Sequence, residues 1–83
     1  MALLRAYTEW HNIQIAPDDI PEEDEPVLVT TENFEGTRRV LGNVFLKQLE
    51  NDTYCWCTYV RNDETMLWEK VIAWTYYPDP YIV

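Results

Sequence analysis

The chain has 83 residues, of which 47% are hydrophobic, and this length allows one small domain with a small core. Only 6 residues are Lys or Arg, whereas 15 are Asp or Glu, so the formal net charge is −9. Six cations are too few to form the clusters that bind duplex DNA or RNA, so such binding is disfavoured. The negative charge also disfavours contact with an anionic membrane surface. The chain contains no serine, which excludes a serine nucleophile.

The N-terminal segment, residues 1–9, lacks the apolar run of a signal peptide. No stretch of the chain approaches the about 20 apolar residues of a membrane span. We therefore predict a cytoplasmic protein with no membrane partner. Cys55 and Cys57 fit this compartment, because a disulfide between residues two apart in an extended strand would be strained.

Short strand-like segments separated by polar turns follow one another along the chain. A weak alternation of polar and apolar residues covers 10–15, and strands are predicted at 27–31, 37–49, 54–60 and 68–77. Polar turns are predicted at 32–36, 51–52 and 61–65. Gly42 marks an expected bulge or bend inside the longest strand. Residues 45–50 also include helix formers, so a short helix after Val44 is an alternative.

This spacing predicts an all-β fold, in which residues 1–83 form one antiparallel sheet or half-open barrel of about five strands. The alternative is an α+β fold with one short helix. Four tryptophans, six tyrosines and two phenylalanines compensate for the short chain, since each aromatic side chain buries a large area. We therefore place Trp10, Trp56, Trp68 and Trp74 in the core or in cross-strand pairs.

An acidic, proline-rich loop at residues 16–26 is the strongest local feature. Three prolines exclude regular helix or central strand there and resist collapse, so the carboxylates are expected to stand in water. Such a loop serves either to keep a small protein soluble or to present a phosphate-like array to a basic partner. The candidate partner-binding residues are Asp18, Asp19, Glu22, Glu23, Asp24 and Glu25, with Glu32 and Glu35 as neighbours.

The remaining reactive side chains do not form a recognisable catalytic or metal motif. Cys55 and Cys57 place two thiols on one face of a strand, but a zinc site needs two more ligands and His11 is the single histidine. A nucleophilic Cys–His pair would depend entirely on the fold. We therefore predict no enzyme, no metal and no cofactor. Arg38 and Arg39 point to opposite faces of a strand, which favours ion pairs with neighbouring strands over a basic patch.

Two segments resemble a known family. Residues 20–29, Ile-Pro-Glu-Glu-Asp-Glu-Pro-Val-Leu-Val, resemble the L-P-x-x-x-x-x-V-L-V stretch of the domain of unknown function 551 family. Residues 71–81 resemble its closing H-W-M-P-L-P-x-P motif, although 75–77 are Thr-Tyr-Tyr where the family has Met-Pro-Leu. The matching residues are Pro21, Val27, Leu28, Val29, Trp74, Pro78 and Pro80. The resemblance implies a small bacteriophage or prophage protein, and it implies no activity.

These features predict a non-enzymatic phage-type accessory protein that binds and inhibits a host target through its acidic surface. The expected target is a defence nuclease or another nucleic-acid-binding protein, because its basic groove complements a charge of −9. The host compartment would be the cytoplasm of an infected or lysogenic bacterium. One alternative is a sponge for a nucleotide signal, in which bases stack on aromatic rings if Arg38, Arg39, Arg61 or Lys70 converge. Another is a minor virion or assembly component that forms a homo-oligomer through exposed strand edges.

Overall fold

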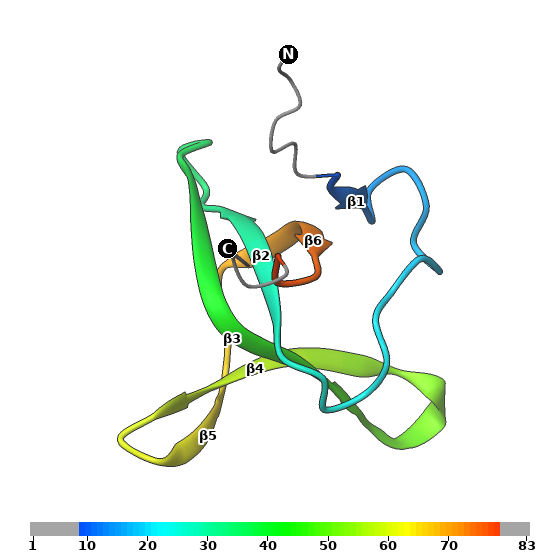
Figure 1. Cartoon of the computed structure of the whole chain (residues 1–83), viewed down its shortest axis with the longest axis vertical. Helices are drawn as coiled ribbons and strands as arrows, with labels where there is room; N and C mark the ends of the chain where they lie inside the picture. The colour runs from blue at the N-terminus through cyan, green and yellow to red at the C-terminus, as the bar shows by residue number, and fades with distance from the viewer. Residues whose placement is uncertain (1–8, 79–83) are drawn as a thin grey trace, which may run out of the picture.

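The structure of the chain is a computed structural model that describes residues 9–78 (Figure 1). These residues form one open, six-stranded antiparallel sheet with the strand order β1-β6-β2-β3-β4-β5. The strands are β1 (His11–Asn12), β2 (Val27–Glu32), β3 (Arg38–Gln48), β4 (Tyr54–Val60), β5 (Asp63–Met66) and β6 (Lys70–Thr75), with a 3-10 turn η1 (Glu50–Asp52) between β3 and β4. The prediction of an all-β antiparallel sheet is therefore confirmed. In the part of the chain that is described, no helix has the length and apolarity needed to cross a membrane.

Strand β3 joins the two halves of the sheet. Its first part pairs with β2, whereas Phe45–Gln48 pairs with β4, so β2 and β6 lie above β4 and β5 in Figure 1. The predicted bulge at Gly42 is confirmed, because the register places both Gly42 and Asn43 opposite Leu28. Asn43 has a positive φ of 54°, which suits a bulged residue. The alternative of a helix after Val44 is wrong, since these residues complete a ladder with β4 instead.

One predicted turn and one predicted alternation differ from the expectation, and both differences concern short edge strands. Residues 61–65 were expected to form a turn, but only Arg61 and Asn62 do so, with φ values of 53° and 70°. Two successive positive φ values define a tight hairpin turn, which brings Asp63–Met66 into pairing with β4 as strand β5. At the other edge, the alternation over 10–15 yields only the two-residue strand β1.

The core lies where the inner faces of both halves of the sheet meet. Its buried members are Val27, Val29, Val44, Leu46, Trp56, Val71 and Trp74. In β2 every second residue is fully or nearly buried, as expected for a strand with one face on the core. Burial of each aliphatic or aromatic side chain stabilises the fold by about 1.5–3 kcal/mol relative to exposure.

The four tryptophans do not share one environment. Trp56 and Trp74 are buried, as predicted, and Trp10 is half-buried. The placement of Trp68 in the core is wrong, because its side chain is 97% exposed. Trp68 lies in the connection between β5 and β6 rather than in a strand, so sheet pairing does not turn it toward the core.

The segment after β6 contacts the sheet again at Tyr77, although this side chain stays exposed. The hydroxyl of Tyr77 accepts a 2.5 Å hydrogen bond from the backbone N–H of Asn43 at the bulge. A Cβ on Gly42 would lie 2.7 Å from that hydroxyl, so the absence of a side chain lets Tyr77 approach. Pro80, one of the residues that carry the family resemblance, falls outside the described residues.

Candidate functional site

The acidic loop, defined as residues 16–26, is anchored to the sheet by buried residues and by backbone hydrogen bonds. Pro21 is buried and Ile20 packs against the core, so the prolines do not hold the loop away from the protein. The backbone N–H of Asp24 donates to the carbonyl of Leu46 at 3.0 Å. These contacts give an irregular, charged segment a defined path across the end of the sheet.

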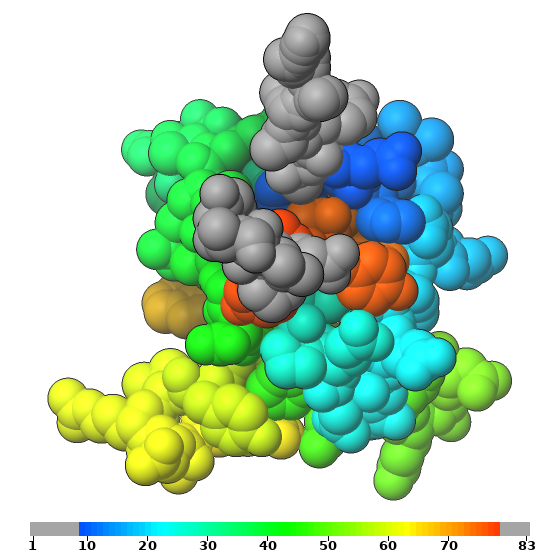
Figure 2. Space-filling model, in the orientation of Figure 1, coloured from blue at the N-terminus to red at the C-terminus, as the bar shows by residue number. Residues whose placement is uncertain are grey.

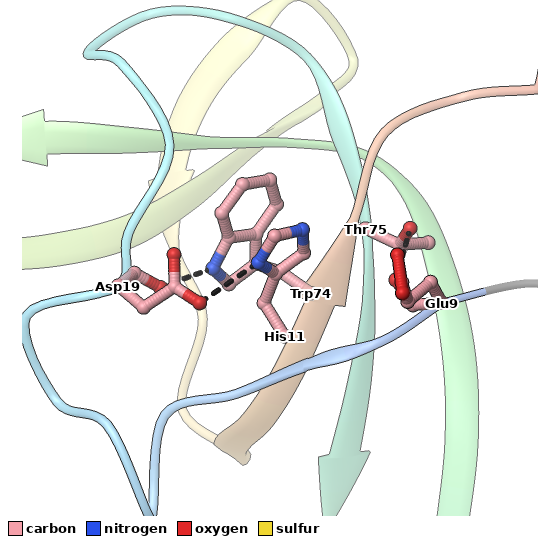
Figure 3. Close-up of polar contacts among 5 residues, drawn as sticks. All are labelled: Glu9, His11, Asp19, Trp74 and Thr75. Atoms are coloured by element: carbon pink, nitrogen blue, oxygen red, sulfur yellow. Dashed lines mark hydrogen bonds and ion pairs between the residues drawn. The ribbon is translucent and has the colours of Figure 1, made fainter.

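A second anchor joins the loop to β1 and β6 (Figure 3). The indole Nε1 of Trp74 donates a 2.6 Å hydrogen bond to the backbone carbonyl of Asp19. The ring of His11 stacks on Trp74 with a centroid distance of 4.2 Å, and its Nδ1 lies 2.8 Å from a carboxylate oxygen of Asp19. Next to this cluster, the Thr75 hydroxyl donates to the carbonyl of Glu9 at 3.0 Å. His11 therefore belongs to a structural contact on an edge strand of the sheet, whereas Cys55 and Cys57 lie on β4.

The predicted acidic residues separate into two groups. Six lie on the acidic loop, whereas Glu32 and Glu35 lie at the opposite end of β2, in and beside the turn to β3. Because β2 rises by about 3.3 Å per residue, its six residues separate the two groups by roughly 17 Å. In Figure 2 the loop lies at the right in blue and cyan, and the β2–β3 turn lies at the upper left in green.

Several of these carboxylates already have partners in the protein. Asp19 contacts His11, and Glu32 pairs with Arg38 at 2.9 Å. The Glu23 carboxylate accepts the backbone N–H of Gln48 at 2.8 Å. Of the eight predicted acidic residues, five have side chains without an ion pair or hydrogen bond to any residue of 9–78, namely Asp18, Glu22, Asp24, Glu25 and Glu35. The acidic loop therefore presents fewer unpaired carboxylates to a partner than its sequence indicates.

A second surface feature, which we call the aromatic groove, lies between the β2–β3 turn and the segment that precedes β6. Its volume is about 750 Å³, within the range of ligand pockets. It is lined by Glu32, Asn33, Phe34, Gly36, Arg39, Leu41, Leu67, Trp68, Glu69 and Lys70. Leu41 and Leu67 pack against the core, whereas Phe34 and Trp68 are 99% and 97% exposed.

An ion pair fixes one part of the aromatic groove. Arg39 donates from Nε at 3.0 Å and from Nη2 at 2.6 Å to the two carboxylate oxygens of Glu69. The buried Thr31 hydroxyl donates to the same carboxylate at 2.5 Å. The hydrogen bond from Arg39, followed by that from Thr31, lowers the pKa of Glu69 below its usual 4.5. The hydrogen bond to Glu69 likewise raises the pKa of Arg39. Arg38 and Arg39 therefore both form ion pairs, as predicted, Arg38 with Glu32 of β2 and Arg39 with Glu69 just before β6.

The two cysteines lie side by side on one face of β4, as their spacing predicts. Their sulfur atoms are 3.6 Å apart, and both thiols are free. Burial of Cys57 raises the pKa of its thiol to about 11, and the contact with Cys55 adds to the shift. A protonated thiol is a poor nucleophile. Over residues 9–78, no group of three or more His, Cys, Asp or Glu side chains is arranged to hold a metal ion.

The aromatic groove was missed in the sequence because its two exposed rings are far apart along the chain. Phe34 is the one bulky apolar residue in an otherwise polar turn, and this mismatch was a usable signal. Trp68 carried no such signal, because aromatic residues next to a strand usually pack in the core. The juxtaposition of the two rings requires the pairing of β2 with both β3 and β6.

Comparisons with known proteins add no further assignment. No family model matches the chain, and neither the curated proteins nor the solved structures contain a match. The resemblance of residues 20–29 and 71–81 to the domain of unknown function 551 family stays a prediction.

Proposed function

We propose that the chain is a non-enzymatic binding protein whose acidic loop occupies a basic surface of a nucleic-acid-binding protein and thereby inhibits it. The net charge of −9 supports this proposal, because it favours encounter with a cationic partner. The partner class is a nuclease or another protein with a basic groove. Direct binding of nucleic acid by this chain is disfavoured by the same charge.

The observation that carries the proposal is the anchoring of the loop. Pro21 is buried, and the carbonyl of Asp19 is held by Trp74, while the carboxylates of Asp18 and Glu22 are exposed to solvent. A charged surface on a fixed backbone loses less conformational entropy on binding than a flexible tail does. The geometry therefore favours a preformed acidic surface over a merely solubilising segment.

The chemistry of the remaining side chains supports action by occupation rather than catalysis. The pKa of Cys57 is raised to about 11 by burial, which leaves its thiol protonated at neutral pH. The contacts of His11 with Asp19 and Trp74 hold that ring in the structural anchor of the loop. A phage or prophage origin, and action in the cytoplasm of a bacterial host, are part of the proposal and rest on the sequence resemblance.

The alternatives receive less support from the geometry. A nucleotide sponge needs converging cations, and Arg39 and Lys70 do line the aromatic groove. However, Arg39 is neutralised by Glu69 within the same groove. Assembly through strand edges would use β1 or β5, but β1 has only two residues, and the charged side chains of Asp63 and Glu64 on β5 oppose edge pairing.

A pair of charge-matched variants tests the proposal. The triple variant Asp18→Asn, Glu22→Gln, Glu25→Gln neutralises three loop carboxylates that have no partner among residues 9–78. The control Glu50→Gln, Asp52→Asn, Asp63→Asn removes the same charge from exposed positions on η1 and β5. Each immobilised protein is exposed to bacterial lysate at low and at high ionic strength, and duplex DNA is added as a competitor.

We expect wild type and the control to retain a nucleic-acid-binding protein at low ionic strength, and DNA or salt to release it. The loop variant should retain much less of the same protein. Equal retention by the two triple variants would refute the loop as the binding surface. Retention that duplex DNA does not compete for would refute the proposed partner class.

A further inference from the structure

We propose that the aromatic groove is a second binding site, which takes a short hydrophobic segment of a partner protein that carries an acidic residue beside its apolar anchor. The site is the juxtaposition of the exposed rings of Phe34 and Trp68 over the aliphatic floor of Leu41 and Leu67, with Lys70 at its margin. It lies at the opposite end of β2 from the acidic loop and uses different chemistry.

The exposure of the two rings is the first argument. Phe and Trp side chains each offer about 150–250 Å² of surface, and here 99% and 97% of the two side chains is open to solvent. Other exposed apolar side chains, such as Ile15 and Met66, lie outside the groove. Phe34 and Trp68 instead line one groove together with polar and charged residues, and exposed apolar surface with a polar margin is typical of an interaction site.

The second argument is that both rings stand on fixed backbone. The side-chain oxygen of Asn33 accepts the N–H groups of Glu35 at 2.9 Å and Thr37 at 3.0 Å, and this closes the turn that displays Phe34. Next to Trp68, the N–H of Leu67 donates to the carbonyl of Trp56 at 2.9 Å.

On the other side of Trp68, the bonds of Glu69 to Arg39 and Thr31 hold the chain. Aromatic anchors on preorganised backbone are typical of the residues that dominate protein binding energies.

The charges of the lining favour an acidic residue in the ligand. Glu32 is paired with Arg38, and Glu69 is paired with Arg39. Among the lining residues, this leaves Lys70 as the cation without an ion pair to any residue of 9–78. One carboxylate therefore finds one counter-charge, whereas a nucleotide phosphate carries more negative charge than the single unpaired Lys70 balances.

The occupant is a segment of another protein rather than a second copy of this chain. Two chains of net charge −9 repel one another, so self-association through this surface is disfavoured. The groove therefore takes a segment of another protein that carries its own acidic residue beside the apolar anchor.

The test is selection from a displayed library of random peptides, with wild-type protein as bait and the Phe34→Ala, Trp68→Ala double variant for counter-selection. We expect enriched peptides in which an aromatic or large aliphatic residue lies beside Asp or Glu. Affinities for synthetic copies should fall by about tenfold or more in each single variant, as for truncated aromatic hot spots. Lys70→Glu should weaken the acidic peptide and leave its Asp→Asn or Glu→Gln copy nearly unchanged.

Two controls keep this result interpretable. Ile15→Ala removes a side chain that is 81% exposed but lies outside the groove, so it should not alter peptide affinity. The loop variant Asp18→Asn, Glu22→Gln, Glu25→Gln should also bind the peptide normally, which separates this proposal from the function of the acidic loop. An unchanged circular dichroism spectrum confirms that each groove variant folds.

Three outcomes would overturn the proposal. The first is a library that shows no enrichment over the double variant. The second is enriched peptides that bind equally to wild type and Trp68→Ala. The third is binding of AMP or a cyclic dinucleotide, with loss in Trp68→Ala, together with no peptide binding, since that pattern assigns the groove to a small anionic ligand.

Discussion

The acidic loop and the aromatic groove display different side chains to solvent, yet hydrogen bonds hold the backbone of both. The loop is highly charged, and its backbone is held by the buried ring of Pro21, by the hydrogen bond from the buried indole of Trp74 and by the hydrogen bond between Asp24 and Leu46. The groove displays apolar rings, yet polar contacts hold its backbone, namely the Asn33 side chain and the Arg39–Glu69 ion pair. Each region therefore contains anchors, such as Trp74 and Glu69, and displayed side chains that hold nothing in place, such as that of Trp68. Substitutions of anchors and of displayed groups should therefore have very different effects on stability.

The largest loss of stability is expected for substitution of Trp74. Trp74 is 1% exposed and donates to the carbonyl of Asp19, so Trp74→Ala should lower the free energy of unfolding by about 3–5 kcal/mol. Trp74→Phe keeps part of the packing but leaves that carbonyl without its donor, which costs about 1–3 kcal/mol. Urea denaturation followed by circular dichroism measures both values. A loss below 1 kcal/mol for Trp74→Ala would contradict the proposed anchor.

A smaller difference is expected between two adjacent glutamates of the loop. The carboxylate of Glu23 accepts the N–H of Gln48, whereas Glu22 has no such contact among residues 9–78. Glu23→Ala should therefore destabilise the fold by about 0.5–1.5 kcal/mol. Glu22→Ala, the matched control, should stay within about 0.5 kcal/mol of wild type. Equal urea midpoints for the two variants would show that Glu23 is a displayed charge rather than an anchor.

The strands of the sheet were predictable where local chemistry and pairing agree. The β-branched run at Val27–Thr31 and the aromatic run at Tyr54–Val60 form strands at the expected positions. Gly42 marks the bulge that the sequence indicated. By contrast, Asp63–Met66 has no apolar alternation, and it becomes β5 only because the tight turn at Arg61 and Asn62 places it beside β4. Edge strands of this kind are specified by their neighbour rather than by their own composition.

The candidate site was predictable to a lesser degree for the same reason. The charge density of the loop predicted exposed carboxylates, and those of Asp18 and Glu22 are exposed. The partners of Asp19 and Glu23 could not be predicted, since His11 and Gln48 reach them only through the fold. The groove depends on contacts between residues more than 30 positions apart, such as that between Thr31 and Glu69. No local pattern encodes a contact at that separation.

The ion pair between Arg39 and Glu69 in the groove should affect how steeply the stability of the fold decreases at acidic pH. Hydrogen bonds from Arg39 and Thr31 hold the pKa of Glu69 below 4.5, so the stability that this carboxylate contributes is present above pH 4.5 and is lost as pH falls through its folded-state pKa. Because Glu69 is partly exposed, the effect is modest. Thermal melting of Glu69→Gln should show a shallower loss below pH 4.5 than wild type.

Glu35→Gln is the matched control, because Glu35 lies in the adjacent turn without an ion pair to any described residue. It removes the same charge and should leave the slope of the acid limb close to that of wild type. Parallel acid limbs for wild type and Glu69→Gln would mean that the ion pair does not hold the groove in solution. The backbone next to Trp68 would then be held on one side only, by the hydrogen bond between Leu67 and Trp56.

The smallest effect on stability is expected for the rings that the groove displays, and it completes the comparison with Trp74. Phe34 and Trp68 are 99% and 97% exposed, so their replacement by Ala should change the free energy of unfolding by less than about 0.5 kcal/mol. Urea denaturation measures the change. A loss of about 2 kcal/mol or more for Trp68→Ala would mean that the ring packs on the protein in solution and that the groove is closed. A near-zero value, beside a large loss for Trp74→Ala, would mean that the fold gains little from a bulky apolar side chain that is available to a partner.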